Sequence, residues 1–278
     1  MNRIAGIATV GVALTIAAKA ITGGMPWINT PAAAQTRHVP RTQVMAGHGV
    51  GPVVVELFTS EGCSSCPPAD RVLSALRGDR SRDKAGVIIL EEHVDYWNRL
   101  GWKDPWSASQ FSDRQSEYAS RFRLDSVYTP QMVVDGRSEL VGSDARRAGD
   151  TIASAARSPK AVVTLEQTDV ANGQIGLKAH VDRSPSGSEP SDVVVVITED
   201  GLRSHVTSGE NSGSTLVHNG VVHTLLTIGQ IEPGTSGSFD GKTVVYIGSG
   251  WRRDKLMAVA FVQQRRSRKI IGAAAIAL

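Results

Sequence analysis

Residues 53–68 read VVVELFTSEGCSSCPP, and they contain the only two cysteines of the 278-residue chain, Cys63 and Cys66. The apolar run that opens this stretch is typical of a buried strand in a parallel or mixed sheet. The two prolines after the second cysteine fit the first turn of a helix, where a missing N–H leaves no hydrogen bond unmade. The stretch therefore predicts a strand, a Cys-x-x-Cys turn and a helix in immediate succession.

This succession is the layout of a dithiol redox site. Free backbone N–H groups and the positive end of the helix dipole stabilise a thiolate at a helix N-terminus. We expect Cys63 to be the nucleophile, exposed at the mouth of the helix, and Cys66 to resolve the mixed disulfide. A disulfide between two such close residues closes a short loop and adds little stability, so the spacing favours chemistry over a structural staple.

Composition and charge narrow the class of protein. Hydrophobic residues make up 41% of the chain and charged residues 21%, which suits one large or two modest globular domains. The net charge is only +3 and the basic residues are dispersed along the sequence. We therefore expect no nucleic-acid partner.

The N-terminus has the features of an export signal. Arg3 precedes an apolar run at positions 4–18, which is too short to span a bilayer. We expect residues 1–34 to be a signal peptide cleaved after the small residues Ala32-Ala33-Ala34. The alternatives are cleavage at Ala18-Lys19-Ala20 and an uncleaved anchor. The rest of the chain is expected to be periplasmic or secreted, with no membrane contact beyond the signal, and residues 35–50 to be a flexible linker.

Residues 51–158 alternate between strand and helix patterns in the order β-α-β-α-β-β-α. Helical crossovers would make the first three strands parallel, and the Asp135-Gly136 turn would add an antiparallel hairpin strand. This order matches a thioredoxin fold. We predict an α/β thioredoxin-like domain here, with a central mixed sheet and flanking helices.

Residues 159–278 carry no helical pattern. Short strand-like runs are separated by the turn signals Asn172-Gly173, Asp200-Gly201, Asn219-Gly220 and Asp240-Gly241. Regular short strands with such turns predict an all-β, sandwich-like C-terminal domain.

Two further residues are candidates for the catalytic site. Thr129-Pro130 precedes a predicted strand, where a thioredoxin-like protein has a cis-proline loop that presents backbone to the substrate. Cis X-Pro bonds are rare, but together with the Cys-x-x-Cys turn we expect one at Pro130. Glu56 interrupts the apolar run and is a candidate proton relay to Cys66, because burial would raise the pKa of its carboxyl. The alternative is that Glu56 faces solvent or a salt bridge.

A tryptophan-rich loop follows the second predicted strand. Trp97, Trp102 and Trp106 form an aromatic platform for an extended substrate in one interpretation, and pack a domain junction in the other. His93, at the strand end, is either structural or a base or metal ligand. His180, His205, His218 and His223 show no recognised metal spacing, so we predict no metal site among them.

Several long segments resemble one bacterial family. They are VELFTSEGCSSCPPAD (residues 55–70), HVDYW (93–97), GWKDPW (101–106), YTPQMVVDG (128–136), and in the second half Glu210-Asn211 and GSTLVHN (213–219). These strings are similar to those of a secreted, thioredoxin-like family of unknown function, domain of unknown function 1223. The resemblance implies a thioredoxin-like fold and export, and it implies no particular reaction.

Three hypotheses about function follow from the sequence. The first is an exported thiol–disulfide oxidoreductase that acts on protein or peptide thiols and disulfides and needs no organic cofactor. The second is a protein that handles Cu(I) with Cys63, Cys66 and His93, since Cu(I) prefers soft thiolate ligands. The third is a binding module whose cysteines rest as an inert disulfide.

Overall fold

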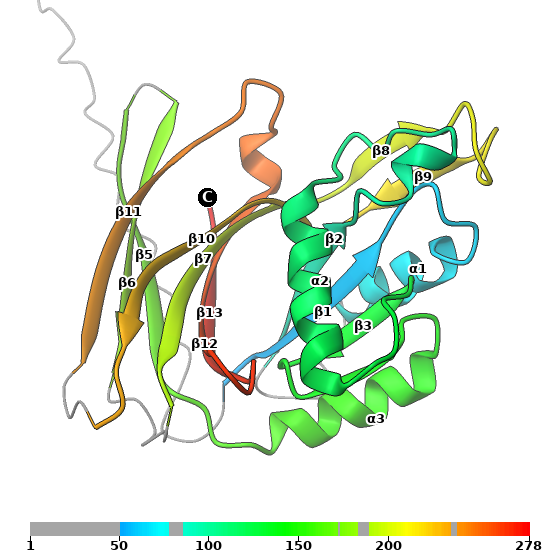
Figure 1. The fold of residues 1–278 in the computed structure, drawn as a ribbon. Coiled ribbons are helices and arrows are strands. Elements are labelled where there is room, and N and C mark those ends of the chain that lie inside the picture. Colours follow the sequence, from blue (N-terminus) through cyan, green and yellow to red (C-terminus); the bar gives the residue numbers. More distant parts are fainter. Residues whose placement is uncertain (1–50, 78–85, 172, 183–188, 235–237) are drawn as a thin grey trace, which may run out of the picture. The chain divides into compact units, whose positions relative to one another are not determined.

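The computed structural model describes residues 51–77, 86–171, 173–182, 189–234 and 238–278 (Figure 1). The expected export signal at residues 1–34 and the linker at residues 35–50 lie outside these ranges. Among the described residues, none of the helices has the length and apolar character needed to cross a membrane.

The first part of the chain contains all three α-helices of the described structure. Its elements are β1 (Val53–Thr59), α1 (Pro67–Leu76), β2 (Val87–His93), a short 3-10 helix (Asn98–Leu100), α2 (Ser109–Phe122), β3 (Gln131–Val134), β4 (Ser138–Val141) and α3 (Ala145–Ala156). The order of strands and helices is the one that the sequence predicts.

The second part of the chain is built of strands. They are β5 (Val163–Ala171), β6 (Gln174–Val181), β7 (Ser191–Glu199), β8 (Leu202–His205), β9 (Thr215–His218), β10 (Val221–Ile231), β11 (Phe239–Tyr246), β12 (Leu256–Gln264) and β13 (Ile270–Ala277), with a 3-10 turn at Arg253–Lys255.

The predicted fold class is wrong. Strands of both parts form one eight-stranded mixed sheet in the order β13-β12-β7-β10-β2-β1-β3-β4, so there is no thioredoxin-like α/β domain followed by a separate all-β sandwich (Figure 1). The join is a parallel pairing of β10 with β2, in which Val221 lies opposite Glu91 and the N–H of Glu91 donates to Gly220 O at 2.8 Å. A pairing between segments this far apart in sequence leaves no local signal.

The expectation of three parallel strands is also wrong. β1 and β2 are parallel, but β3 is antiparallel to β1, with Gln131 opposite Phe58. The reason is the segment at 123–130, which returns the chain to the sheet end that it left after β2. Gln115 of α2 supports this return by donating to Tyr128 O at 2.7 Å.

Side chains alternate along β1 and divide its surroundings into two cores. Val53, Val55 and Leu57 pack with α1 and α3, whereas Val54 and Phe58 pack with α2 and with strands β7, β12 and β13. A third core lies between the second part of the large sheet and the three-stranded sheet β11-β6-β5. The alternation decides which polar residues of β1 and β2 can meet, because residues at odd and even positions face different cores.

A buried ion pair joins the β3–β4 turn to the segment that enters β5. Lys160 Nζ lies 2.5 Å from Asp135 Oδ2 and 3.3 Å from the carbonyl oxygen of Pro52. Asp135 Oδ1 accepts the N–H of Val54 at 3.0 Å, and its carbonyl accepts the N–H of Ile270 at 2.8 Å. Asp135 thereby ties the first strand to the start of the last one.

We expect Lys160→Met to destabilise the protein by about 3–5 kcal/mol, because the buried Asp135 carboxylate then loses its cation. Urea unfolding measures this change. The control is Arg146→Met in the exposed Arg146–Asp150 pair, which is expected to change stability by less than ~0.5 kcal/mol. A loss for Lys160→Met no larger than that of the control would contradict the role given to the buried pair.

The β3–β4 turn also depends on a glycine. Gly136 has φ +60°, and a Cβ there would overlap the backbone carbonyl of Arg268. We expect Gly136→Ala to destabilise by at least ~2 kcal/mol more than Gly173→Ala, because overpacking adds to the backbone strain. Gly173 is a matched control, with φ +77° and no atom within 4 Å of its Cβ position. Thermal or urea unfolding measures the stability of both variants. Equal losses of stability would show that the Arg268 carbonyl does not lie this close to Gly136.

Candidate functional site

The two cysteines form a disulfide in the turn between β1 and α1, as the spacing predicts. Their Cα atoms are 5.4 Å apart. Cys63 N donates to Ser60 O and Cys66 N to Cys63 O, each at 3.1 Å, so the turn is closed by backbone bonds. Cys66 rather than Cys63 is the N-cap residue of α1, and its carbonyl accepts the N–H groups of Ala69 and Asp70.

The expected exposure of the disulfide is wrong, because both Cys63 and Cys66 are 0% exposed. Only Ser64 and Ser65, between them, face solvent. A loop from the second part of the chain, the β8–β9 loop (residues 206–214), holds this turn. Its residue Asn211 donates to Glu61 O at 2.8 Å and to Cys63 O at 3.0 Å. A partner sulfur therefore reaches the disulfide only if this arrangement opens.

Glu210 of the same loop accepts the N–H of Ser64 at 2.9 Å. At the base of the loop, Ser208 Oγ donates to Gly101 O at 2.6 Å. The β8–β9 loop is thus fixed both to the cysteine turn and to the tryptophan-rich loop.

The Thr129-Pro130 bond is cis, which confirms the prediction for Pro130. Thr129 is the residue of this segment that meets the disulfide. Its hydroxyl lies 3.3 Å from Cys63 Sγ and its carbonyl oxygen 3.9 Å away. Ser65 Oγ is also 3.3 Å from Cys63 Sγ, so two hydroxyl groups lie against this sulfur.

The three tryptophans lie around the site and are partly exposed. Trp97 Nε1 donates to Thr129 Oγ1 at 2.9 Å, and Trp102 Nε1 to Glu61 Oε2 at 2.8 Å. The Trp106 ring packs edge-on against His93 and His218, with centroid distances of 5.5 and 5.2 Å. All three rings therefore support the site by packing, and their contact with a substrate stays a prediction.

Glu56 is not brought to the disulfide. It is fully buried on the α2 side of β1, where Arg114 Nε donates to its carboxylate at 2.6 Å and Tyr118 OH at 2.5 Å. Glu92 shares this environment, 3.5 Å from Arg114 Nε. Burial and the charge of Glu56 raise the pKa of Glu92 well above its ordinary value. The salt-bridge alternative for Glu56 is therefore the one observed.

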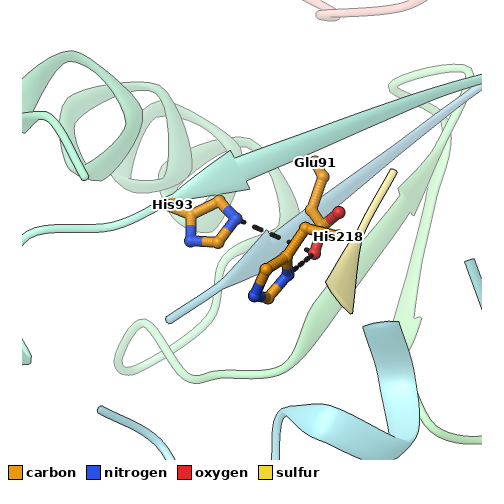
Figure 2. A group of neighbouring side chains, drawn as sticks. All are labelled: Glu91, His93 and His218. Atoms are coloured by element: carbon orange, nitrogen blue, oxygen red, sulfur yellow. Dashed lines mark hydrogen bonds and ion pairs between the residues drawn. The ribbon is translucent and has the colours of Figure 1, made fainter. Parts of the chain in front are cut away.

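A cluster that sequence reasoning missed lies on the α1 side of β2. Glu91 and His93 are two residues apart on β2, so their side chains share a face, and His218 reaches them from β9 (Figure 2). His218 Nδ1 lies 2.6 Å and His93 Nε2 3.7 Å from Glu91 Oε1. All three residues are buried.

Two more carboxylates complete this histidine–carboxylate cluster, which we define as Glu61, Glu91, His93, Asp104 and His218. Asp104 Oδ2 lies 2.7 Å from His93 Nδ1, and Glu61 Oε1 lies 3.2 Å from His218 Nε2. Asp104 Oδ2 also accepts the N–H of Glu61 at 2.9 Å. Because Glu61 precedes the cysteine turn by one residue, the cluster and the disulfide share a backbone segment.

The cluster concentrates charge away from solvent. Burial opposes protonation of His218, but the charge of Glu91 and hydrogen bonds to Glu61 and Glu91 raise its pKa to about 11. Burial likewise opposes the charges of His93 and Asp104, yet their mutual attraction raises the pKa of His93 and lowers the pKa of Asp104. Burial and the charge of Glu91 raise the pKa of Asp70, on α1, to about 7.

The chain matches one known protein family over most of its length. A profile described as "Protein of unknown function (DUF1223)" matches residues 54–263. The chain belongs to this family. The resemblance of the sequence strings to domain of unknown function 1223 is thereby confirmed, and the matched range includes the disulfide, Pro130 and the histidine–carboxylate cluster of this DUF1223 protein.

Two solved structures share the fold of this DUF1223 protein. Protein AGR_C_4864 from Agrobacterium tumefaciens is 26% identical, with a TM-score of 0.62, and the match covers 83% of this chain and 96% of that one. HBP35 of Porphyromonas gingivalis is 16% identical, with a TM-score of 0.64 over 84% of this chain and 77% of that one, a likeness of fold alone. No curated protein matches the chain.

One sequence signal could have pointed to the cluster. Glu91, Glu92 and His93 place three ionisable residues in a strand that is otherwise apolar, and burying them requires partners from elsewhere. The partner His218 stands just before the Asn219-Gly220 turn, whose signal was recognised but whose position beside β2 was not.

We expect Thr129→Val to destabilise the protein by about 1 kcal/mol, because the indole N–H of Trp97 then loses its acceptor. Thr129→Ser keeps the hydroxyl and is the matched control. Urea unfolding followed by tryptophan fluorescence compares the three proteins. A valine variant as stable as the serine variant would show that the hydroxyl group does not hold Trp97.

Proposed function

We propose that this protein exchanges thiols and disulfides with protein or peptide partners through the Cys63–Cys66 pair. Support comes from the position of the disulfide at the N-terminus of α1 and from the hydroxyl groups around one of its sulfurs. The short loop that the disulfide closes contributes little stability, so a purely structural role explains it poorly.

The two sulfurs have different surroundings, and this difference is the observation that carries the proposal. Thr129 Oγ1 and Ser65 Oγ both lie 3.3 Å from Cys63 Sγ. Hydroxyl donors stabilise the negative charge of a thiolate, and Cys63 is therefore the sulfur that partners attack and that attacks them. Cys66 caps α1, whose positive end stabilises the thiolate that departs.

Exchange with a partner takes place in two steps. A partner thiolate attacks Cys63 Sγ, a bond between the partner sulfur and Cys63 forms, and the Cys63–Cys66 bond breaks. Its electron pair leaves on Cys66 Sγ, which becomes a thiolate. A second partner thiolate then attacks the partner sulfur of the mixed disulfide, and the bond between that sulfur and Cys63 breaks, with its electron pair leaving on Cys63 Sγ. The partner becomes a disulfide, and the Cys63–Cys66 pair is reduced by two electrons.

Burial of both cysteines makes access the controlling step. We assign this control to the β8–β9 loop, because Asn211 binds the carbonyl groups of Glu61 and Cys63 and Glu210 binds the N–H of Ser64. Release of these bonds frees the cysteine turn. The reaction needs no organic cofactor, and with the expected export signal it takes place in the periplasm or outside the cell.

A second function is favoured by one observation. Both cysteines are 0% exposed, as expected for a binding module with a permanently closed disulfide. The Cu(I) hypothesis gains no such support, because His93 contacts Asp104, Glu91 and the rings of Trp106 and His218. The test therefore compares an exchangeable disulfide with a closed one.

We expect Asn211→Ala to speed reduction of the disulfide by dithiothreitol about tenfold, since the two lost hydrogen bonds are worth about 0.5–1.5 kcal/mol each and 1.4 kcal/mol is a factor of ten. Trapping of free thiols and mass measurement give the rate. Ser212→Ala is the control in the same loop, because its hydroxyl bonds only Thr207 O within the loop.

A second experiment tests whether Cys63 forms a mixed disulfide with a partner. The Cys66→Ser variant is incubated with insulin or with another peptide that contains a disulfide. Its Cys63 thiolate is expected to attack that disulfide, release one peptide thiol and accumulate as a mixed disulfide with the other. Cys63→Ser is expected to form none. A disulfide that stays closed under thiol concentrations that reduce exposed disulfides, with no acceleration by Asn211→Ala, would favour the binding module and remove the exchange function.

A further inference from the structure

The histidine–carboxylate cluster is not used by thiol exchange, and one of its buried nitrogen atoms has no hydrogen bond. His93 is fully buried, yet its Nε2 has no hydrogen bond. Buried polar atoms in folded proteins are almost always hydrogen-bonded, so an unpaired nitrogen in a buried cluster marks a place for a water molecule or an ion. This nitrogen points towards Glu91 and His218, as Figure 2 shows.

We propose that Glu91, His93 and His218 bind a divalent transition-metal ion, with Zn²⁺ as the best-fitting ion. The ligand atoms are His93 Nε2, His218 Nδ1 and a carboxylate oxygen of Glu91, which all lie within 4.8 Å of one another. Two imidazoles and one carboxylate form a known zinc ligand set that leaves a fourth position for water or a substrate.

The second nitrogen of each imidazole supports this assignment. His93 Nδ1 lies 2.7 Å from Asp104 Oδ2, and His218 Nε2 lies 3.2 Å from Glu61 Oε1. Metal-binding histidines almost always donate their other N–H to a carboxylate or carbonyl, which fixes the ring and leaves the free nitrogen towards the ion. Here both histidines have that carboxylate.

The distances fit a metal site after small shifts. Two ligand atoms about 2.1 Å from a tetrahedral ion lie roughly 3.4 Å apart. His93 Nε2 and Glu91 Oε1 are 3.7 Å apart, close to that separation. His218 Nδ1 and Glu91 Oε1 are 2.6 Å apart, so this pair opens by about 0.8 Å when the ion takes the place of the shared proton.

The charge of the cluster also suits a divalent cation. Glu61, Glu91 and Asp104 are three buried carboxylates, and among the described residues no lysine or arginine forms an ion pair with any of them. Trp106, itself partly exposed, packs against both ligand rings and separates them from solvent.

The first test is a Zn²⁺ titration of chelator-treated protein against a chromophoric competitor. We expect one ion per chain, a loss of affinity of at least about 100-fold for His93→Gln and His218→Gln, and a loss of about 10–100-fold for the positioning variant Asp104→Asn. His223→Gln is the matched control, because His223 stacks on Trp251 and pairs with Glu199, and it should bind as tightly as the wild type.

The second test uses the unaltered protein with Co²⁺, so it does not depend on the folding of a variant. We expect visible ligand-field bands of a site with nitrogen and oxygen ligands, and no thiolate-to-cobalt charge-transfer band. We also expect partial quenching of the tryptophan fluorescence, because Trp106 packs against both ligand rings. The variant Cys63→Ser/Cys66→Ser should bind Zn²⁺ unchanged, which separates this site from thiol chemistry. Absence of binding by the wild type, binding retained in both histidine variants, or a thiolate band would overturn the assignment.

Discussion

The parallel pairing of β10 with β2 is the contact on which the site depends. It consists of Val221 opposite Glu91 and of the bond from Glu91 N to Gly220 O. The turn that enters β10 is thereby fixed against β2, and His218, at the end of β9, is held beside Glu91 and His93. The β8–β9 loop, which ends where β9 begins, is in the same way brought onto the cysteine turn.

Strand alternation then sorts the buried charges. Glu91 and His93 face the side of α1, where the disulfide turn, Asp104 and His218 lie, whereas Glu92 faces Arg114 and Glu56 on the side of α2. Two buried polar groups therefore lie back to back across one strand. In each group the carboxylates contact basic side chains, His93 and His218 on one side and Arg114 on the other, because isolated charges are strongly disfavoured in an interior. Because Glu56 lies on the side of α2, its carboxylate is kept away from the two sulfurs.

Local signals in the sequence were sufficient for much of the structure. The order of strands and helices and the Cys63–Cys66 disulfide follow from patterns a few residues long, and the cis bond at Pro130 was expected from its combination with the Cys-x-x-Cys turn. What the sequence could not supply were pairings between distant segments. The direction of β3 depends on the return path at 123–130, and the continuity of the sheet depends on Val221.

The candidate site was likewise predictable only where its contacts lie within the first half of the chain. Thr129 lies beside Cys63, as expected of the residue before a cis proline in a dithiol protein, whereas the bond of Trp97 to Thr129 was not predicted. The bond of Asn211 to Cys63 O and the contact of His93 with His218 involve residues of the second half, so no spacing in the first half reveals them. The side of the sheet on which Glu56 lies could have been predicted, because side chains alternate along a strand and Glu56 and Leu57 must face different cores.

The place of β2 within the sheet also has a consequence for the order of folding. During synthesis the chain emerges from its N-terminus, so β2 carries an open edge of N–H and C=O groups until β10 has been made. Until then the edge of β2 is free to pair with other strands. It is covered by its native partner only when the chain has grown to Val221, in β10.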